Sequence, residues 1–272
     1  MSSPAPDDAV LREARGTTRR VARTFAIACR LLPRELRDEV YRLYLVFRTL
    51  DDLVDDGDAR AWERVALVEA WCADDVVASR EAAILADLDR RHPIPREAMA
   101  DFCRGMWSDI AGAPMLTEAD VDTYCHRVAG TVGIVMSSVL GTVEDDLARP
   151  RAAALGRAMQ RTNILRDIDE DLDGGRVYLA RETLERFGGH RAIEPGRREA
   201  LLRDQIGRAD ALYEEGLAGI PLLRSGRRAI AAAAAMYREI LRQIEREGYG
   251  ARRGRPVVPT SRKLLLAARA RG

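Results

Sequence analysis

Two clusters of acidic side chains recur at helical spacing in this sequence. Asp51 and Asp55 are four residues apart, so on a helix both carboxylates project from the same face. Further along the chain, Asn163, Asp167 and Asp171 repeat this interval. Like charges at such spacing cost an isolated helix about 0.2 to 0.5 kcal/mol per pair. A sequence that repeats them therefore indicates a compensating cation.

Carboxylate and amide oxygens are hard ligands, and they point to Mg²⁺. Magnesium prefers a few carboxylates together with water and substrate phosphate oxygens to a complete protein cage. Two sparse acidic faces on opposite sides of a cavity would suit that preference. The competing explanation is that each cluster is an ordinary solvated face. Apolar neighbours such as Phe47 and Ile164, which accompany the two clusters, argue against full solvation.

The arginines beside these clusters suggest a phosphorylated substrate. A diphosphate leaves an allylic carbon once its charge is neutralised, and bridging metal ions act as the Lewis acid. Arginine completes such a clamp through bidentate hydrogen bonds. Arg48 and Arg166 lie within the two clusters, and Arg176 follows the second. A surface ion pair is the competing role for each of them.

Ionisation would leave a carbocation, which needs a dry pocket with aromatic walls that attract positive charge. The aromatic candidates, each of which could instead be ordinary core packing, are Phe25, Tyr41, Tyr44, Tyr124 and Tyr237. The sequence contains no Ser/His/Asp set, phosphate-binding P-loop or GxGxxG fingerprint. The usual nucleophilic, nucleotide-triphosphate and dinucleotide chemistries therefore lack their motifs.

Composition excludes several other classes of protein. The 44 basic and 43 acidic residues nearly cancel, so no global field would gather nucleic acid. Four scattered cysteines and three histidines show no metal-ligand spacing, and the thiols suit a reducing cytoplasm. Neither a signal peptide nor an apolar run long enough to span a bilayer is apparent. We expect a cytoplasmic protein, either soluble or peripheral at the inner face of the membrane.

The elements that would position these side chains are helices throughout. Aromatic residues make up 5% of the sequence, and alternating runs of β-branched residues are scarce. Apolar residues recur at three- and four-residue intervals over residues 17–32, 36–54, 59–78, 96–110, 118–143, 151–172, 197–217 and 227–247. We expect one domain over residues 1–272, with 1–15 and 250–272 as its loosest parts and a short last helix after the basic tail.

Ordered motifs along most of the chain resemble the squalene/phytoene synthases, the head-to-head branch of trans-prenyl transferases. They comprise Thr24-Phe25 with residues 31–33, the first acidic segment over 44–56, the segment 124–133, the second acidic segment over 160–171 with 175–179, and Arg262-Lys263. The resemblance implies an all-α, single-domain isoprenoid synthase bundle around a central active-site cavity. It also implies that two farnesyl or geranylgeranyl diphosphates condense, through a cyclopropylcarbinyl diphosphate, to a squalene- or phytoene-type product.

Roles for individual residues follow from the same resemblance. The metal ligands would be Asp51, Asp55, Asn163, Asp167 and Asp171, holding two or three Mg²⁺ ions for which Mn²⁺ could substitute. The diphosphate contacts would be Arg48, Gln160, Asn163, Arg166, Arg176 and Tyr178. The catalytic and cavity-lining positions would include Phe25, Cys29, Tyr41, Tyr44, Tyr124, Val128, Ala129, Gly133, Leu155, Met159 and Tyr237. Gly130 and Gly133 would leave room for a prenyl chain, at about 1 kcal/mol of helix propensity each.

One departure from the family pattern keeps alternatives open. Val21 and Ala22 stand where the family carries polar groups that help to hold a diphosphate. A class I terpene cyclase that uses a single prenyl diphosphate is therefore a second hypothesis. A third is a non-catalytic relative that acts as an assembly or lipid-binding factor, against which the intact aspartates argue.

The sequence leaves further properties open. Substrate length is not fixed, although Cys29, Ala152, Leu155 and Met159 align with positions that would set cavity depth. A reductive, squalene-type reaction would need NADPH, and no sequence motif shows whether this chain binds it. We expect a monomer or weak dimer. The arginine-rich tail is either a solvated segment or a contact with the membrane surface.

Overall fold

A computed structural model of the chain describes residues 6–270, whose regular structure is helical apart from one isolated antiparallel bridge between Thr142 and Leu223. The predicted all-α fold is confirmed. The α-helices are α1 (Pro6–Val21), α2 (Arg23–Cys29), α3 (Arg34–Asp55), α4 (Ala61–Asp74), α5 (Arg80–Asp89), α6 (Arg96–Ile110), α7 (Glu118–Cys125), α8 (Thr131–Leu140), α9 (Asp145–Arg166), α10 (Ile168–Asp173), α11 (Arg181–Arg186), α12 (Glu199–Leu217), α13 (Arg227–Arg246) and α14 (Thr260–Arg269). The shorter turns are η1 (His126–Gly130), η2 (Gly189–Ile193) and η3 (Ile220–Leu222).

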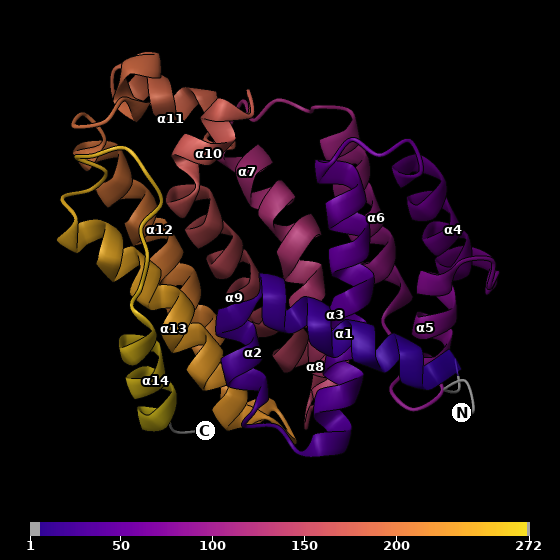
Figure 1. Cartoon of the computed structure of the whole chain (residues 1–272). Helices are drawn as coiled ribbons and strands as arrows, with labels where there is room; N and C mark the ends of the chain where they lie inside the picture. Colours follow the sequence, from indigo (N-terminus) through magenta and orange to yellow (C-terminus); the bar gives the residue numbers. More distant parts are fainter. Residues whose placement is uncertain (1–5, 271–272) are drawn as a thin grey trace.

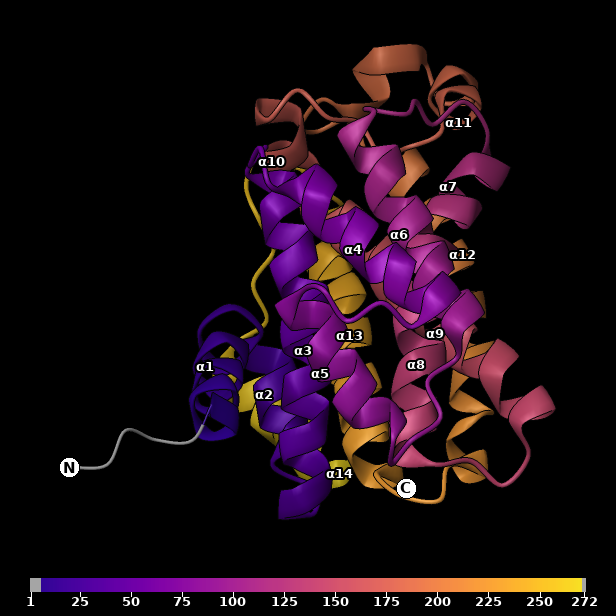
Figure 2. The same cartoon turned by 90° about the vertical axis from the view of Figure 1, so that its right-hand side faces the viewer.

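The helices form a bundle around α9 (Figure 1). Helices α12 and α13 pack against one side of α9, and α8 packs against it from the side that also holds α3 and α6. Helix α4 covers α6, and α1 crosses α3 on the outside of the bundle, as the rotated view also shows (Figure 2). Two large apolar cores result, one within α3–α6–α8 and one within α7–α9–α12–α13.

Several predicted helices match the structure closely. Helix α6 has the predicted bounds of 96–110, and α13 ends at Arg246, one residue before the predicted end. The predicted short helix after the basic tail is α14, which begins at Thr260. None of the helices within residues 6–270 is long and apolar enough to cross a membrane.

Other predicted helices are divided or displaced. The helix predicted over 17–32 is two helices that meet at Ala22, whose φ and ψ of −119° and 55° are not helical. The one predicted over 151–172 starts earlier, at Asp145, and is broken at Asp167. Helices α5 and α11 were not predicted. The Ser79 side chain, which caps α5 by accepting from the Ala82 N–H at 3.1 Å, is the signal for the first of these.

The expected loose ends are partly helical. Helix α1 begins at Pro6, so most of the expected loose segment 1–15 is helical, and α14 lies within the expected loose segment 250–272. Residues 1–5 and 271–272 lie outside the described residues.

The helix predicted over 118–143 contains a π-helical turn, η1, between α7 and α8. Such turns insert one extra residue into a helix and often occur at functional sites. Helix α9 crosses this region in backbone contact: a Cβ built on Gly133 would lie 2.3 Å from the Ala152 carbonyl oxygen, and one on Gly156 would lie 2.1 Å from that of Ala129. The expected reason for Gly133, room for a substrate, is therefore joined by a packing requirement.

We expect Gly156→Ala to lower the free energy of unfolding by about 1 to 3 kcal/mol, because its methyl group would force η1 away from α9. Chemical denaturation measures this. The matched control is Gly207→Ala in α12, where a Cβ meets nothing within 4 Å and removing glycine from a helix adds up to about 1 kcal/mol. Equal stability of the two variants would contradict the close crossing.

Candidate active site

The two acidic clusters meet at one end of the bundle. Helix α3 carries Asp51 and Asp55, whereas Asp167 lies at the break between α9 and α10, and Asp171 lies within α10. The Arg176 guanidinium, just beyond α10, bonds the Asp55 carboxylate with an N–O distance of 2.7 Å, which joins segments 121 residues apart in sequence. The two acidic clusters therefore lie on facing segments at this end of the bundle, as expected from the sequence.

Crowding of like charges changes the acidity of these groups. Burial, and then the charge of Asp55, raises the pKa of Asp51 to about 7. Burial and the neighbouring Asp167 raise the pKa of Asp171 to about 6. The Asp51 side chain is surrounded by protein, yet 42% of its surface is accessible because it lines a cavity. Both shifts make these carboxyl groups easier to protonate when no cation is present.

The predicted arginines lie against the same carboxylates. Arg48 bonds Asp51 with an N–O distance of 2.8 Å and also pairs with Asp52. The Arg166 Nε bonds Asp167 at 2.7 Å. These guanidinium groups reduce the net negative charge of the cluster and have further N–H donors for phosphate oxygens.

A cavity of about 740 Å³ extends from the acidic end between the two apolar cores. Phe102 and Met136 belong to the first core and Leu155 to the second, and all three line the cavity. The residues predicted from the sequence that line it are Phe25, Tyr44, Arg48, Asp51, Tyr124, Val128, Ala129, Gly133, Ala152, Leu155, Met159, Gln160, Asn163, Arg166 and Tyr237.

Two predicted lining residues lie elsewhere. Tyr41 is 3% exposed and Cys29 is 1% exposed, and both belong to the core formed by α3 and its neighbours. Cys29 borders a separate, much smaller pocket that shares Phe25 with the main cavity. The prediction of Tyr41 and Cys29 as walls of the main cavity is therefore wrong, because residue type and motif position do not distinguish a cavity wall from the core behind it.

The aromatic residues gather in two pairs. The Phe25 and Tyr44 rings have centroids 5.3 Å apart, and the Tyr124 and Tyr178 rings stack at 5.1 Å. The Tyr124 hydroxyl donates to Asp109 with an O–O distance of 3.3 Å, and Tyr178 accepts from Arg176 at 3.3 Å. Tyr178 and Arg176 thus lie at the acidic mouth, whereas Phe25, Tyr44 and Tyr124 face the interior.

The donor set fits a magnesium ion that is shared with a ligand. Among residues 6–270, no three His, Cys, Asp or Glu side chains converge as a complete metal cage. Magnesium seldom requires one, because water and phosphate oxygens supply most of its ligands. The Asn163 side-chain oxygen is buried without a hydrogen-bond partner, while its Nδ2 donates to Gln160 at 3.2 Å. An unpaired hard oxygen beside a carboxylate cluster suits a cation.

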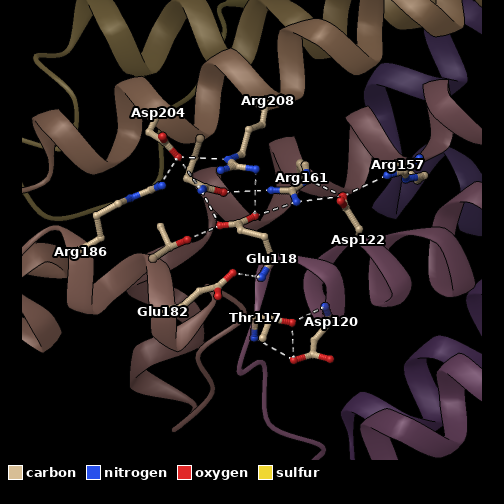
Figure 3. A network of polar contacts seen from close by, with 12 residues as sticks. Thr117, Glu118, Asp120, Asp122, Arg157, Arg161, Glu182, Arg186, Asp204 and Arg208 are labelled. Carbon is tan, nitrogen blue, oxygen red and sulfur yellow. Dashed lines mark hydrogen bonds and ion pairs between the residues drawn. The ribbon is translucent and has the colours of Figure 1, made fainter.

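Buried polar contacts on the opposite face of α9 fix its orientation. Arg161, which is 3% exposed, bonds Glu118 and Asp122 of α7 and Gln205 of α12, each at 2.9 Å (Figure 3). Because residues one position apart on a helix project in different directions, the bonds of Arg161 leave Gln160 to line the cavity.

Two residues at the acidic end are not among those predicted from the sequence. Asp109, in the last turn of α6, accepts from Tyr124, and burial raises its pKa to about 6. Its only signal is an acid in the last turn of an amphipathic helix. Arg255, in the basic tail, lines the cavity and bonds Asp167 with an N–O distance of 3.0 Å. Its sequence context of neighbouring arginines resembles a solvated tail.

The raised pKa values predict how stability depends on pH. Between about pH 4 and pH 7 the metal-free folded protein binds protons that the unfolded chain releases, so the free energy of unfolding falls as pH rises. For Asp51 we expect the free energy of unfolding to fall by on the order of 1 kcal/mol over this range, because partial exposure of the side chain weakens the contribution of its pKa shift to stability. This corresponds to about 2 to 4 °C in melting temperature.

Thermal unfolding with chelator present tests this dependence, and Asp51→Asn should reduce the slope. Asp56→Asn, at the exposed end of the same motif, should retain the wild-type slope. If Asp51→Asn has the same dependence of melting temperature on pH as wild type, the Asp51 carboxyl does not cause that dependence.

Comparisons with known proteins identify the family of this chain. Residues 18–262 match the family model described as squalene/phytoene synthase. The chain is 39% identical to a phytoene synthase of Thermus thermophilus over 83% of this chain and 80% of the relative, and 34% identical to a 15-cis-phytoene synthase of Synechococcus elongatus over 93% and 89%. A solved dehydrosqualene synthase with bound ligand superposes with a TM-score of 0.89 at 28% identity, over 97% of this chain and 96% of that one. The resemblance inferred from the motifs is confirmed, and the chain belongs to the squalene/phytoene synthase family of prenyl-transferring enzymes.

Proposed function

We propose that this enzyme is a Mg²⁺-dependent transferase that joins two geranylgeranyl diphosphates head to head to form a phytoene-type C40 hydrocarbon. The observation that carries the proposal is one cavity with an acidic, arginine-bearing end and an interior walled by two apolar cores. Such a cavity suits a substrate with a diphosphate head and a long hydrocarbon tail. The names of the related phytoene synthases support the C20 substrate and the C40 product.

The acidic end would hold both the metal ions and the diphosphates. Asp51 and Asp55 from one side, and Asn163, Asp167 and Asp171 from the other, would be the metal ligands. Bound Mg²⁺ would supply Lewis-acid neutralisation of the leaving group.

The diphosphate oxygens would be bound by basic and amide groups at the same end. Arg48, Gln160 and Arg166 line the cavity within reach of a bound head group. At the mouth, Arg176 bonds both Asp55 and Tyr178, so it could move its N–H donors to a diphosphate without leaving the cluster. These contacts would orient the C1–O bond that breaks.

The interior would direct the carbon chemistry. As the C1–O bond of one substrate breaks, its allylic cation is captured by the C2–C3 double bond of the second, and loss of a proton closes the ring of a cyclopropylcarbinyl diphosphate. The released diphosphate is the proposed proton acceptor. The Phe25, Tyr44 and Tyr124 rings would stabilise the cation through their faces. Departure of the second diphosphate, rearrangement and loss of another proton would give a phytoene-type product without a reductant.

The segment that departs from the family pattern can still hold a second diphosphate. Val21 and Ala22 line the cavity where α1 meets α2, and their neighbours Arg20 and Arg23 line it as well. Two guanidinium groups would supply positive charge and N–H donors for the oxygens of that diphosphate. This arrangement supports the two-substrate reaction over the single-substrate cyclase.

We expect purified enzyme with geranylgeranyl diphosphate and Mg²⁺ to form a C40 hydrocarbon in the absence of NADPH. Gas chromatography with mass spectrometry of an organic extract identifies the product, and parallel reactions with farnesyl diphosphate and with added NADPH test the alternatives. A cyclic C20 or C15 product would overturn the two-substrate reaction. A C30 product from farnesyl diphosphate alone would overturn the choice of substrate.

Loss of single metal ligands should abolish most of this activity. We expect Asp51→Asn and Asp167→Asn each to lower kcat by at least about 100-fold, because leaving-group charge would no longer be neutralised. Steady-state assays over a range of Mg²⁺ concentrations measure this, and circular dichroism verifies folding. The control is Asp56→Asn, which should retain activity. Full activity in folded Asp51→Asn would remove this carboxylate from the proposed metal site.

A further inference from the structure

The acids of α10 face two different environments. Asp167 and Asp171 lie one helical turn apart at the cavity mouth, but Asp169, two residues from each, projects elsewhere. Asp169 is 7% exposed and pairs with Arg198, which is 3% exposed. The Arg198 Nη1 donates to Asp169 Oδ2 at 3.0 Å, and Arg198 Nη2 donates to Asp169 Oδ1. The third donor, Arg198 Nε, bonds the Ile193 carbonyl oxygen.

This pair also holds the segment that joins α13 to α14. We name residues 250–258 the C-terminal strap; it runs from the level of α10 toward α14 and is yellow in both views (Figures 1 and 2). The Gly254 N–H donates to Asp169 Oδ2 at 2.8 Å. The Gly250 carbonyl accepts from the Gly196 N–H at 3.1 Å, two residues before Arg198.

The strap reaches the active-site end directly beyond this attachment. The residue after Gly254 is Arg255, whose guanidinium lies 3.0 Å from Asp167 and 3.3 Å from Glu170. Pro256, Val257 and Val258 then line the cavity, and Val258 is 3% exposed. The anchored glycine thus precedes four consecutive residues that face the site.

The chemistry of the pair suits a positional role. A buried ion pair is often no more stabilising than apolar residues of similar size, so its value commonly lies in specifying geometry. The donors of Arg198 and Gly254 occupy both carboxylate oxygens of Asp169. An acid with its acceptor sites occupied by protein donors has little capacity for a metal ion.

We propose that Asp169 and Arg198 form a latch that fixes the C-terminal strap across the cavity mouth and places Arg255 against Asp167. In this role Asp169 is a positioning residue within the second acidic motif and is not a metal ligand. Opening the latch would leave the metal cluster intact but would weaken capture of the substrate. Only the kinetic part of this inference rests on the proposed function.

Three variants test the latch. Asp169→Asn removes the charge that Arg198 and Gly254 bind. Gly254→Pro removes the backbone donor from the strap side, in an exposed loop with φ of 124° that proline cannot adopt. The comparison variant is Asp173→Asn, on the same short helix, where a 67% exposed carboxylate pairs with Arg253 of the strap at the surface. It removes an exposed contact of the strap and leaves Asp169 in place, so it tests whether the buried pair and not the surface pair holds the strap.

The first measurement is limited trypsin digestion of substrate-free protein, with mass spectrometry of the fragments. We expect cleavage after Arg252 to be about tenfold faster in Asp169→Asn and Gly254→Pro than in wild type, and unchanged in Asp173→Asn, because one charge-assisted hydrogen bond corresponds to about this factor in the opening equilibrium. Gly254→Pro leaves the buried pair intact, so it decides the question if Asp169→Asn fails to fold.

The second measurement is steady-state kinetics with the prenyl diphosphate. We expect KM to rise about tenfold in both latch variants, with kcat within about twofold of wild type and an unchanged Mg²⁺ concentration for half-maximal rate. A higher Mg²⁺ requirement in Asp169→Asn with unaltered digestion would make Asp169 a metal ligand and overturn the latch. Unaltered digestion and KM in Gly254→Pro would also overturn it. If wild type transfers no prenyl group, the proposed function fails, while digestion still decides the latch.

Discussion

The structure depends on bringing like charges together at one end of the helical bundle. Asp51 and Asp55 on one helix face Asp167 and Asp171 on another, and their burial raises the pKa of Asp51 and of Asp171. Such a cluster is destabilising by itself, so the surrounding chain must supply compensating charge and rigidity. Arginines from four separate segments lie against these carboxylates, and the polar network around Arg161 sets the orientation of α9 that they require.

The apolar half of the molecule serves the same site in another way. Two cores pack on either side of a cavity and do not merge into one, so a space of about 740 Å³ persists between them. Phe25 and Tyr44 line this space with their rings in contact, and Tyr124 links it to the acidic mouth through Asp109. In the proposed function, the charged head group would lie at the acidic mouth and the hydrocarbon chain between the two cores.

Much of this arrangement could be predicted from periodicity and spacing. The all-α fold, the limits of α6 and the facing acidic motifs followed from local patterns, because an amphipathic helix and an i, i+4 pair are properties of short segments. The break at Asp167 and the π-helical turn at η1 could not be predicted, since tertiary packing overrides helix propensity there. Nothing in the spacing distinguished Tyr41 in the core from Tyr44 in the cavity.

The residues that sequence reasoning missed share a cause. Asp109 and Arg255 reach the site through contacts between distant segments, and their local sequences resemble an ordinary helix end and a charged tail. Asp169 shows the opposite problem, in which the local sequence suggests a role that the contacts do not support. It lies within an acidic motif, but its carboxylate pairs with Arg198 on another face of the helix. Composition and spacing identify which side chains could act, whereas the packing of α10 against its neighbours decides which way each one points.

The close crossing of α9 with η1 and α8 has a consequence for how this enzyme can diverge. At Gly133 and Gly156 the cavity wall consists of backbone atoms of two crossing segments. Glycine has no side chain to shorten, so no substitution at these positions can widen the cavity. Elsewhere the wall consists of side chains such as Leu155 and Met159, which single mutations can shorten or enlarge. Evolution can therefore tune the length of the hydrocarbon that is accepted in small steps, while the width of the channel at this crossing is inherited with the backbone.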